Sequence, residues 1–360
     1  MKEGKNMKLC TPEYFKDFHC IADKCTDCCC IGWEIDIDDK TADIYSKIPG
    51  EFGKKLRKNI IFSKTNSFIL DKHERCPFLN NQNLCEIFIA LGQNNLCEIC
   101  TEHPRYYEWF NGIKEGGIGL CCEEAARIIL SQDKPFNTYE TEIPFESADE
   151  YDSELYSYLF NSRNKIISYI DNTSLPFNFR IRNILWYTCL IQENIDNDRL
   201  NNIDISVVNS YSQSNLQHVL EFFLTLEPFD VNWIPYLRDC INLYNNYFSK
   251  IEDFENSNPE IFKFLQNISI YFIWRYFLKG VFDGDVLSKV KLMAVSIAVI
   301  KYLFFCRWLK NGNLTFNDCV EIAKKYSKEI EYSEDNLSNL VNAYYEIDSF
   351  SLENLIGLFS

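Results

Sequence analysis

The sequence has no glycine between Leu120 and Lys279, although its 360 residues include 13 glycines. Glycine is the residue that most readily adopts positive φ, so this stretch has few sharp turns and favours helices joined by simple loops. The motifs GxSxG, GxxxxGK[ST], HExxH and GxGxxG are also absent. Their absence leaves no sequence signal for a nucleophile elbow, a P-loop, a zincin helix or a Rossmann phosphate loop. The CxxxCxxC triad of radical S-adenosylmethionine enzymes is missing as well.

Acidic side chains outnumber basic ones, which gives the chain a net charge of -16. Without a dense basic patch, we expect no nucleic-acid partner. No apolar segment follows the basic start, so no secretory signal is predicted. The strongest candidate for a membrane span is the apolar run at residues 292–306, which is interrupted by Lys301 and is too short to cross a bilayer. We therefore expect a buried helix there, no membrane insertion and a cytoplasmic protein.

Cysteine is abundant, with 16 residues in the chain. Twelve lie at or before Cys122, at positions 10, 20, 25, 28, 29, 30, 76, 85, 97, 100, 121 and 122. In a reducing cytosol such a framework binds metal or performs chemistry more often than it forms disulfides. A disulfide scaffold is the alternative for a secreted protein.

The composition divides the chain into two parts. Residues 1–130 carry 20 acidic and 17 basic side chains, a net charge of -3, whereas residues 131–360 carry 32 and 19, a net charge of -13. We predict a mainly α protein. An irregular cysteine-rich metal-binding domain with a few short strands comes first (1–130), and an acidic α-helical domain follows (131–360). Residues 131–154, with two prolines and no clear period, are the predicted boundary.

Apolar residues three or four apart predict helices in the second part. The predicted segments are 179–194, 215–228, 233–248, 259–282, 286–312 and 315–331. Gly312 is a stop signal, and Thr315 with Asp318 has capping-box spacing. In the first part, residues 32–39, 66–71 and 116–121 are predicted strands.

Two CxxC pairs, Cys25 with Cys28 and Cys97 with Cys100, each supply two thiolates from one turn of chain. Distant cysteines would complete a centre, and Cys76, Cys85 and Cys122 are the obvious ones. Thiolates bind zinc and iron–sulfur clusters alike, so the metal stays open. A zinc site with His103 is an alternative, although His103 also fits a plain loop residue before Pro104.

Four stretches, "CIADKCTDCCCIGW", "CPFLNNQNLCEI", "LCEICTEHPRYY" and "GLCCEEAARIIL", resemble in this order the motifs of the flagellin lysine N-methylase (FliB-type) family. Part of the pattern is shared with putative zinc- or iron-chelating CxxCxxCC domains. The resemblance covers residues 9–130. Its matching cysteines are Cys20, Cys25, Cys29, Cys30, Cys76, Cys85, Cys97, Cys100 and Cys122. The other matching positions are Gly32, Trp33, Pro77, Pro104, Arg105, Glu124, Ala125, Ala126 and Arg127. Cys28 and Cys121 depart from the family pattern and leave the ligand set open.

The resemblance implies methyl transfer from S-adenosylmethionine to lysine ε-amines of flagellin, and a [4Fe-4S] cluster held by the matching cysteines. Lysine has an ordinary pKa of about 10.4, so such a site must desolvate the amine or offer a base, for which no residue is singled out. A non-catalytic zinc- or iron-binding protein and a redox relay are the alternatives.

Three further expectations concern where particular side chains lie. In the triplet, Cys29 and Cys30 should point to opposite sides of an extended chain, with Trp33 shielding the sulfurs. Cysteines 189, 240, 306 and 319 lie among apolar residues and should be buried and unligated. Acidic runs at 146–154 and 329–335 are expected to face solvent and attract the cationic substrate.

Overall fold

The computed structural model describes all residues except 1–5, 33, 111, 147–149, 209–211 and 213. Its contacts divide the chain into two compact units. The helical unit comprises the chain up to Asp17, Tyr107–Cys121 and Ala126–Ser360. The cysteine-rich unit comprises Phe18–Tyr106 and Cys122–Ala125. The units therefore do not follow a single cut at residue 130, because the chain returns to each of them.

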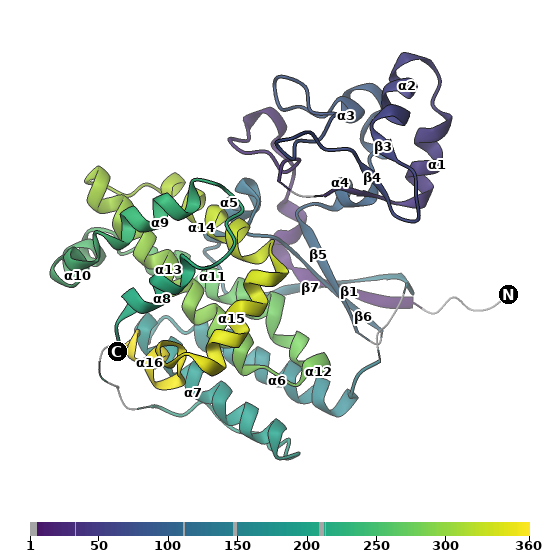
Figure 1. The fold of residues 1–360 in the computed structure, drawn as a ribbon. Coiled ribbons are helices and arrows are strands. Elements are labelled where there is room, and N and C mark those ends of the chain that lie inside the picture. Colours follow the sequence, from purple (N-terminus) through teal and green to yellow (C-terminus); the bar gives the residue numbers. More distant parts are fainter. Residues whose placement is uncertain (1–5, 33, 111, 147–149, 209–211, 213) are drawn as a thin grey trace. The chain divides into compact units, whose positions relative to one another are not determined.

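The cysteine-rich unit contains a small sheet, short helices and long loops (Figure 1). Its strands β2 (Asp36–Ile37), β3 (Ile60–Ile61) and β4 (Asn66–Phe68) pair antiparallel in the order β2-β4-β3. Its helices are α1 (Asp39–Lys47), α2 (Gly50–Lys58), α3 (Glu86–Leu91) and α4 (Glu98–Glu102). Tyr45, Phe68 and Phe78 lie at the centre of its apolar core.

The helical unit contains a second sheet, of four strands in the order β5-β6-β1-β7. These are β1 (Asn6–Pro12), β5 (Arg105–Phe110), β6 (Ile113–Ile118) and β7 (Thr138–Pro144). The central strand β1 runs parallel to β6 and antiparallel to β7. The sequence predicted β2, β4 and β6 with shifted bounds but missed β1, β3 and β5, and it missed β7 inside the segment expected to be a linker.

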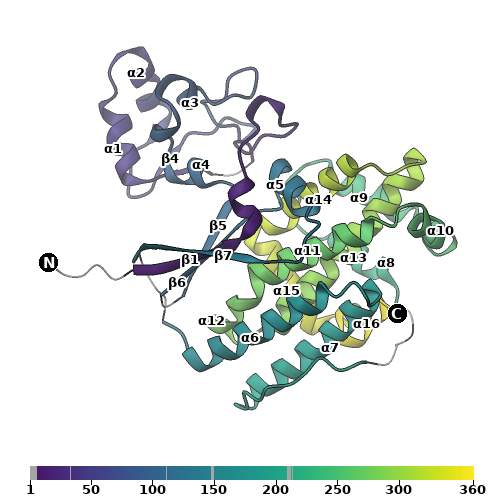
Figure 2. The same ribbon diagram turned by 180° about the vertical axis from the view of Figure 1, so that it is seen from behind.

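The rest of the helical unit is α-helical (Figure 2). Its helices are α5 (Glu123–Leu130), α6 (Ser153–Ile170), α7 (Phe177–Asp196), α8 (Leu216–Phe223), α9 (Trp233–Ile241), α10 (Tyr244–Ser257), α11 (Ile261–Tyr276), α12 (Gly280–Asp283), α13 (Leu287–Asn311), α14 (Phe316–Glu331), α15 (Glu334–Glu346) and α16 (Leu352–Gly357). The first three residues of α5 belong to the cysteine-rich unit. The predicted fold class is thus confirmed. Single helices were expected at 233–248 and 259–282, and both are interrupted: α10 starts anew at Tyr244, and a 3-10 turn separates α11 from α12.

Helix α13 forms the core of this unit and packs against α11, α7 and α14. Among the described residues it is the one helix long and apolar enough to cross a membrane, but 83% of its most apolar window is buried. The expected buried helix is confirmed, although it is 25 residues long and exceeds the apolar run. Lys301, which interrupts that run, pairs with Glu255.

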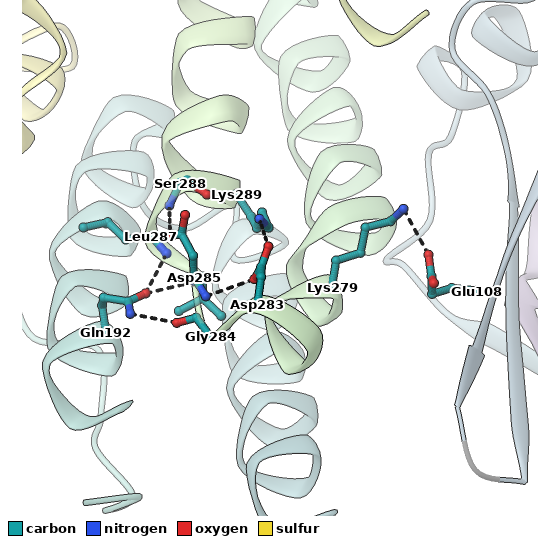
Figure 3. Close-up of polar contacts among 10 residues, drawn as sticks. Glu108, Gln192, Lys279, Asp283, Gly284, Asp285, Leu287, Ser288 and Lys289 are labelled. Carbon is teal, nitrogen blue, oxygen red and sulfur yellow. Dashed lines mark hydrogen bonds and ion pairs between the residues drawn. The ribbon is translucent and has the colours of Figure 1, made fainter. Parts of the chain in front are cut away.

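The start of α13 is capped from a neighbouring helix (Figure 3). Gln192 Oε1 accepts hydrogen bonds from the Val286 and Leu287 amides at 2.9 and 3.2 Å, and Gln192 Nε2 donates to Gly284 O at 2.8 Å. Asp285 Oδ1 accepts from the Ser288 amide at 3.0 Å. These side chains satisfy amides that have no partner within the helix, so they fix where the core helix begins.

Candidate metal centre

Backbone pairing brings the first two cysteine motifs together in the cysteine-rich unit. The Cys76 amide donates to Cys30 O at 3.0 Å, and the Gly32 amide donates to Glu74 O at 3.1 Å. A β-bridge joins Ile31 to Arg75 between them. Gly32 has φ of 91°, a conformation that favours glycine and explains why a glycine occupies this position of the first motif.

The second motif closes a loop on itself. A bridge joins Leu79 to Cys85, and the Glu86 amide donates to Phe78 O at 2.7 Å. Cys85 then caps α3, because its Sγ accepts from the Phe88 amide at 3.5 Å. Cys76 and Cys85 are therefore held at the two ends of one compact turn.

The third motif places two thiols on one short helix. Cys97 is the N-cap of α4, and Cys100 follows within its first turn. Asp38 accepts from the Glu98 amide at 2.9 Å and from the Thr41 amide at 2.9 Å, so a single carboxylate starts both α4 and α1. Cys97 is fully buried. His103 follows this helix and forms a cis peptide bond with Pro104.

These thiols interact electrostatically. A hydrogen bond with Cys100 lowers the pKa of Cys97 and raises the pKa of Cys100. A hydrogen bond with Cys30 lowers the pKa of Cys28 to about 6, and the pKa of Cys30 rises correspondingly. Burial raises the pKa of Cys76 to about 12. The structure thus contains two thiol pairs, each with one sulfur that ionises more readily than its partner.

The electrostatic interactions also connect the motifs. The thiols that influence one another's pKa are Cys28, Cys29, Cys30, Cys76, Cys85, Cys97 and Cys100. We call these seven residues the thiol cluster. Within the described residues, no three Cys, His, Asp or Glu side chains converge closely enough to hold one metal ion as they stand. The structure therefore shows a gathering of thiols without a closed coordination sphere.

Cys20, Cys25 and Cys122 belong to the same unit, and a carboxylate links the motifs that contain Cys25 and Cys122. Glu123, next to Cys122, accepts from the Thr26 amide at 2.9 Å and also from the Thr26 hydroxyl. The Cys25 Sγ lies 3.8 Å from the same carboxylate. Sequence reasoning missed Glu123, which joins the first motif to the fourth. Its place beside a predicted ligand was the available signal.

The CCC triplet differs from the prediction. Cys29 and Cys30 have sulfurs 3.9 Å apart and do not point to opposite sides, because the chain turns there instead of running extended. The structure adds Cys28 to the thiol cluster, although it departs from the family pattern. Trp33, the expected shield, lies outside the described residues.

Cys121 belongs to the helical unit and lies beside a buried polar network. Glu331 Oε2 accepts from the hydroxyls of Tyr271 and Tyr276 at 2.8 and 2.7 Å, and Arg275 Nη1 lies 3.0 Å from it. The Leu120 amide donates to the Tyr271 hydroxyl at 3.2 Å. Through the Leu120 amide, the network therefore holds the backbone in place two residues before Cys122.

The helical unit matches a known family. The model of the FliB lysine N-methylase C-terminal domain matches residues 163–358, more than half of the chain. The chain belongs to this family. No solved structure matches it.

Curated relatives of this FliB-family chain come from Salmonella. The flagellar biosynthetic protein FliU of Salmonella muenchen is 26% identical over 134 residues, which cover 35% of this chain and 79% of FliU. Lysine-N-methylases of Salmonella choleraesuis and Salmonella typhimurium are each 25% identical over 134 residues, which cover 35% of this chain and 33% of each relative. The match thus spans a third of the length of these two methylases.

The structure corrects two expectations, one about buried cysteines and one about acidic surface runs. Cys240, Cys306 and Cys319 are buried as predicted, but Cys189 is only partly buried. The predicted acidic surface at 329–335 is wrong in part. Glu329 and Glu331 are 1% and 8% exposed, because α14 points them inward toward buried hydrogen-bond donors. The other acidic run, 146–154, includes three residues outside the described part of the chain.

Proposed function

We propose that this chain is an S-adenosylmethionine-dependent protein-lysine N-methyltransferase whose substrate is flagellin. The observation that carries the proposal is the match of its helical unit to the FliB lysine N-methylase C-terminal domain. The names of its relatives, lysine-N-methylase and flagellar biosynthetic protein, support the reaction and the flagellar substrate. We place the reaction in the cytoplasm, where the thiols of the cysteine-rich unit stay reduced.

The reaction is a nucleophilic transfer. The lone pair of a neutral lysine ε-nitrogen attacks the sulfonium methyl carbon, and a new C–N bond forms as the S–CH₃ bond breaks. The bonding electron pair stays on sulfur, which leaves as the thioether of S-adenosylhomocysteine. The methylated ammonium then releases one proton to a base. Because lysine is ordinarily protonated at neutral pH, the enzyme must supply a desolvated site or that base.

The thiol cluster fits an iron–sulfur centre by the chemistry of its donors. Seven thiols gather there, and the buried ones lie in the apolar core with Tyr45 and Phe78, away from water. Cys30, Cys76, Cys97 and Cys100 would hold a [4Fe-4S] cluster, with zinc as the alternative metal. A cluster supplies either electron transfer or structural stabilisation of this unit when bound.

Metal content tests this part of the proposal. We expect protein purified without oxygen to be brown, with iron and sulfide bound and visible charge-transfer absorption. Cys97→Ser with Cys100→Ser should lose most of the iron, whereas Cys319→Ser, a buried cysteine of the helical unit, should retain it. Colourless protein that contains stoichiometric zinc would show that the thiols hold zinc and not an iron–sulfur cluster.

Co-expression tests the enzymatic activity. Flagellin produced together with the chain in a host lacking its own methylase should carry methylated lysines in peptide mass spectra. The matched control is flagellin produced with the Cys97→Ser, Cys100→Ser double variant. If flagellin lysines stay unmodified beside soluble, metal-loaded wild-type protein, the flagellin methylase assignment is wrong.

A further inference from the structure

Strand β7 is the outer strand of the four-stranded sheet, at the edge opposite β5. Nearly all its residues are exposed, and Tyr139 is 58% exposed. Natural proteins usually shorten or cover such an edge, because it presents unpaired main-chain groups to other chains. Among the described strands, none pairs with the outer side of this seven-residue strand.

The register shows which main-chain groups face outward. The Lys8 amide of β1 donates to Gly112 O on the β6 side, so the main-chain groups of Lys8 point away from β7. Because alternate residues of a strand point their main-chain groups to opposite sides, Leu9 pairs with Thr141 of β7. The amide and carbonyl groups of Glu140 and Glu142, on either side of Thr141, therefore lie on the open edge. Within the described part of the chain, no hydrogen bond joins them to another segment.

The side chains at the same two positions are acidic. The Glu140 carboxylate pairs with Lys8 at 2.7 Å, whereas the Glu142 carboxylate accepts only a neutral hydrogen bond from Asn6 Nδ2, at 3.3 Å, among the described contacts. A residue paired directly opposite on an added strand would lie about 5 Å away on the same face. Lys8 lies opposite Glu142 in the β1–β7 register but forms its ion pair with Glu140, so a lysine at that position would supply Glu142 with an ion pair of its own.

We propose that the β7 edge binds an extended, lysine-bearing segment of the protein substrate as an additional strand, with a lysine opposite Glu142. Main-chain hydrogen bonds supply the affinity in this mode, and the acidic pair selects a cationic strand. A second copy of the chain fits less well. Antiparallel self-pairing centred on Thr141 would place Glu140 opposite the partner's Glu142, and directly opposed like charges are destabilising. The inference rests on the proposed function for the identity of the substrate.

Amide hydrogen exchange on the full chain provides the test. The probes are overlapping 12-residue peptides that span flagellin, together with a matched set in which every lysine is replaced by glutamine. We expect a lysine peptide to slow exchange at Glu140 and Glu142, whose amides face outward, with little change at the already bonded Thr141. The glutamine counterpart should bind several-fold more weakly.

Three variants separate the backbone from the charge. Glu140→Pro removes one outward amide together with the Glu140 carboxylate and leaves the β1–β7 hydrogen bonds intact. Glu140→Gln removes the same carboxylate but keeps the amide, so we expect peptide binding about tenfold weaker in Glu140→Pro than in Glu140→Gln. Glu142→Lys retains the backbone and reverses the charge, and it should also abolish the preference for lysine over glutamine peptides. If Glu140→Pro alters the circular dichroism spectrum, its weaker binding reflects a change in fold. The test then depends only on whether Glu142→Lys still prefers lysine over glutamine peptides.

The outcomes distinguish this inference from the proposed function. Unprotected β7 amides with every peptide, or an unchanged lysine preference in Glu142→Lys, would overturn the docking site even if flagellin is methylated. Concentration-dependent protection of β7 without peptide would indicate self-association and would also overturn it. Peptide-dependent protection without methyl transfer would support the docking site and count against the methylase assignment.

Discussion

Replacing Glu331 should strongly destabilise the helical unit, because its buried carboxylate collects several donors. It accepts from Tyr271, Tyr276 and Ser327 at 2.8, 2.7 and 2.6 Å and is 3.0 Å from Arg275. Glu331→Ala would remove the acceptor that three hydroxyls and a guanidinium share. Each unsatisfied buried group costs about 1–3 kcal/mol, although local relaxation makes the total smaller than the sum. We expect a loss of about 4 kcal/mol in the free energy of unfolding.

Two variants grade the effect. Glu331→Gln retains one acceptor oxygen and should cost about 2 kcal/mol, and Tyr276→Phe removes a single donor and should cost about 1 kcal/mol. Urea unfolding of the purified protein, followed by tryptophan fluorescence and fitted with a common m-value, measures all three. A cost below about 1 kcal/mol for Glu331→Ala, or a larger cost for Tyr276→Phe, would refute the account of this network.

Two further predictions concern stability. Gln192→Ala should lower the free energy of unfolding by about 2 kcal/mol in the same urea assay, because it removes three hydrogen bonds at the start of α13. An unchanged urea midpoint would mean that water replaces the Gln192 side chain. Burial raises the pKa of Glu329 to about 7, above the ordinary 4.5, so the folded state holds a proton that the unfolded state releases. Stability should therefore fall as pH rises from about 4.5 to about 7, by up to roughly 3 kcal/mol, and Glu329→Gln should lack this fall. Parallel pH profiles for the two proteins would contradict the second prediction.

Local signals predicted the helical part well. The capping box of Thr315 and Asp318 and the left-handed Gly312 lie where the sequence placed the end of one helix and the start of the next. Both depend on residues a few positions apart, which sequence reasoning can see directly. The apolar spacing of 179–194 likewise predicted α7.

Long-range pairing explains what the sequence did not reveal. Strand β1 pairs with β6 and β7, which lie more than 100 residues away along the chain, so its bounds depend on partners that no local pattern identifies. Lys301 and Glu331 looked like an interruption and a surface charge. Their partners, Glu255 and Tyr271, come from other helices.

The sequence predicted which residues form the candidate site better than it predicted how they are arranged. The CxxC pair of Cys97 and Cys100 lies on one helical turn, as the spacing suggested. The CxxC spacing paired Cys28 with Cys25, whereas the structure pairs Cys28 with Cys30. That pairing and the link from Glu123 to Thr26 depend on how loops fold back, and spacing does not encode that.

Methyl transfer by purified protein tests the central claim most directly. The chain, isolated without oxygen and with its metal content measured, would be incubated with flagellin and S-adenosylmethionine labelled in the methyl group. We predict label on lysine ε-nitrogens and one S-adenosylhomocysteine formed for each methyl group transferred. Metal-loaded, folded protein that leaves flagellin lysines unlabelled, while S-adenosylmethionine remains intact, would contradict the account.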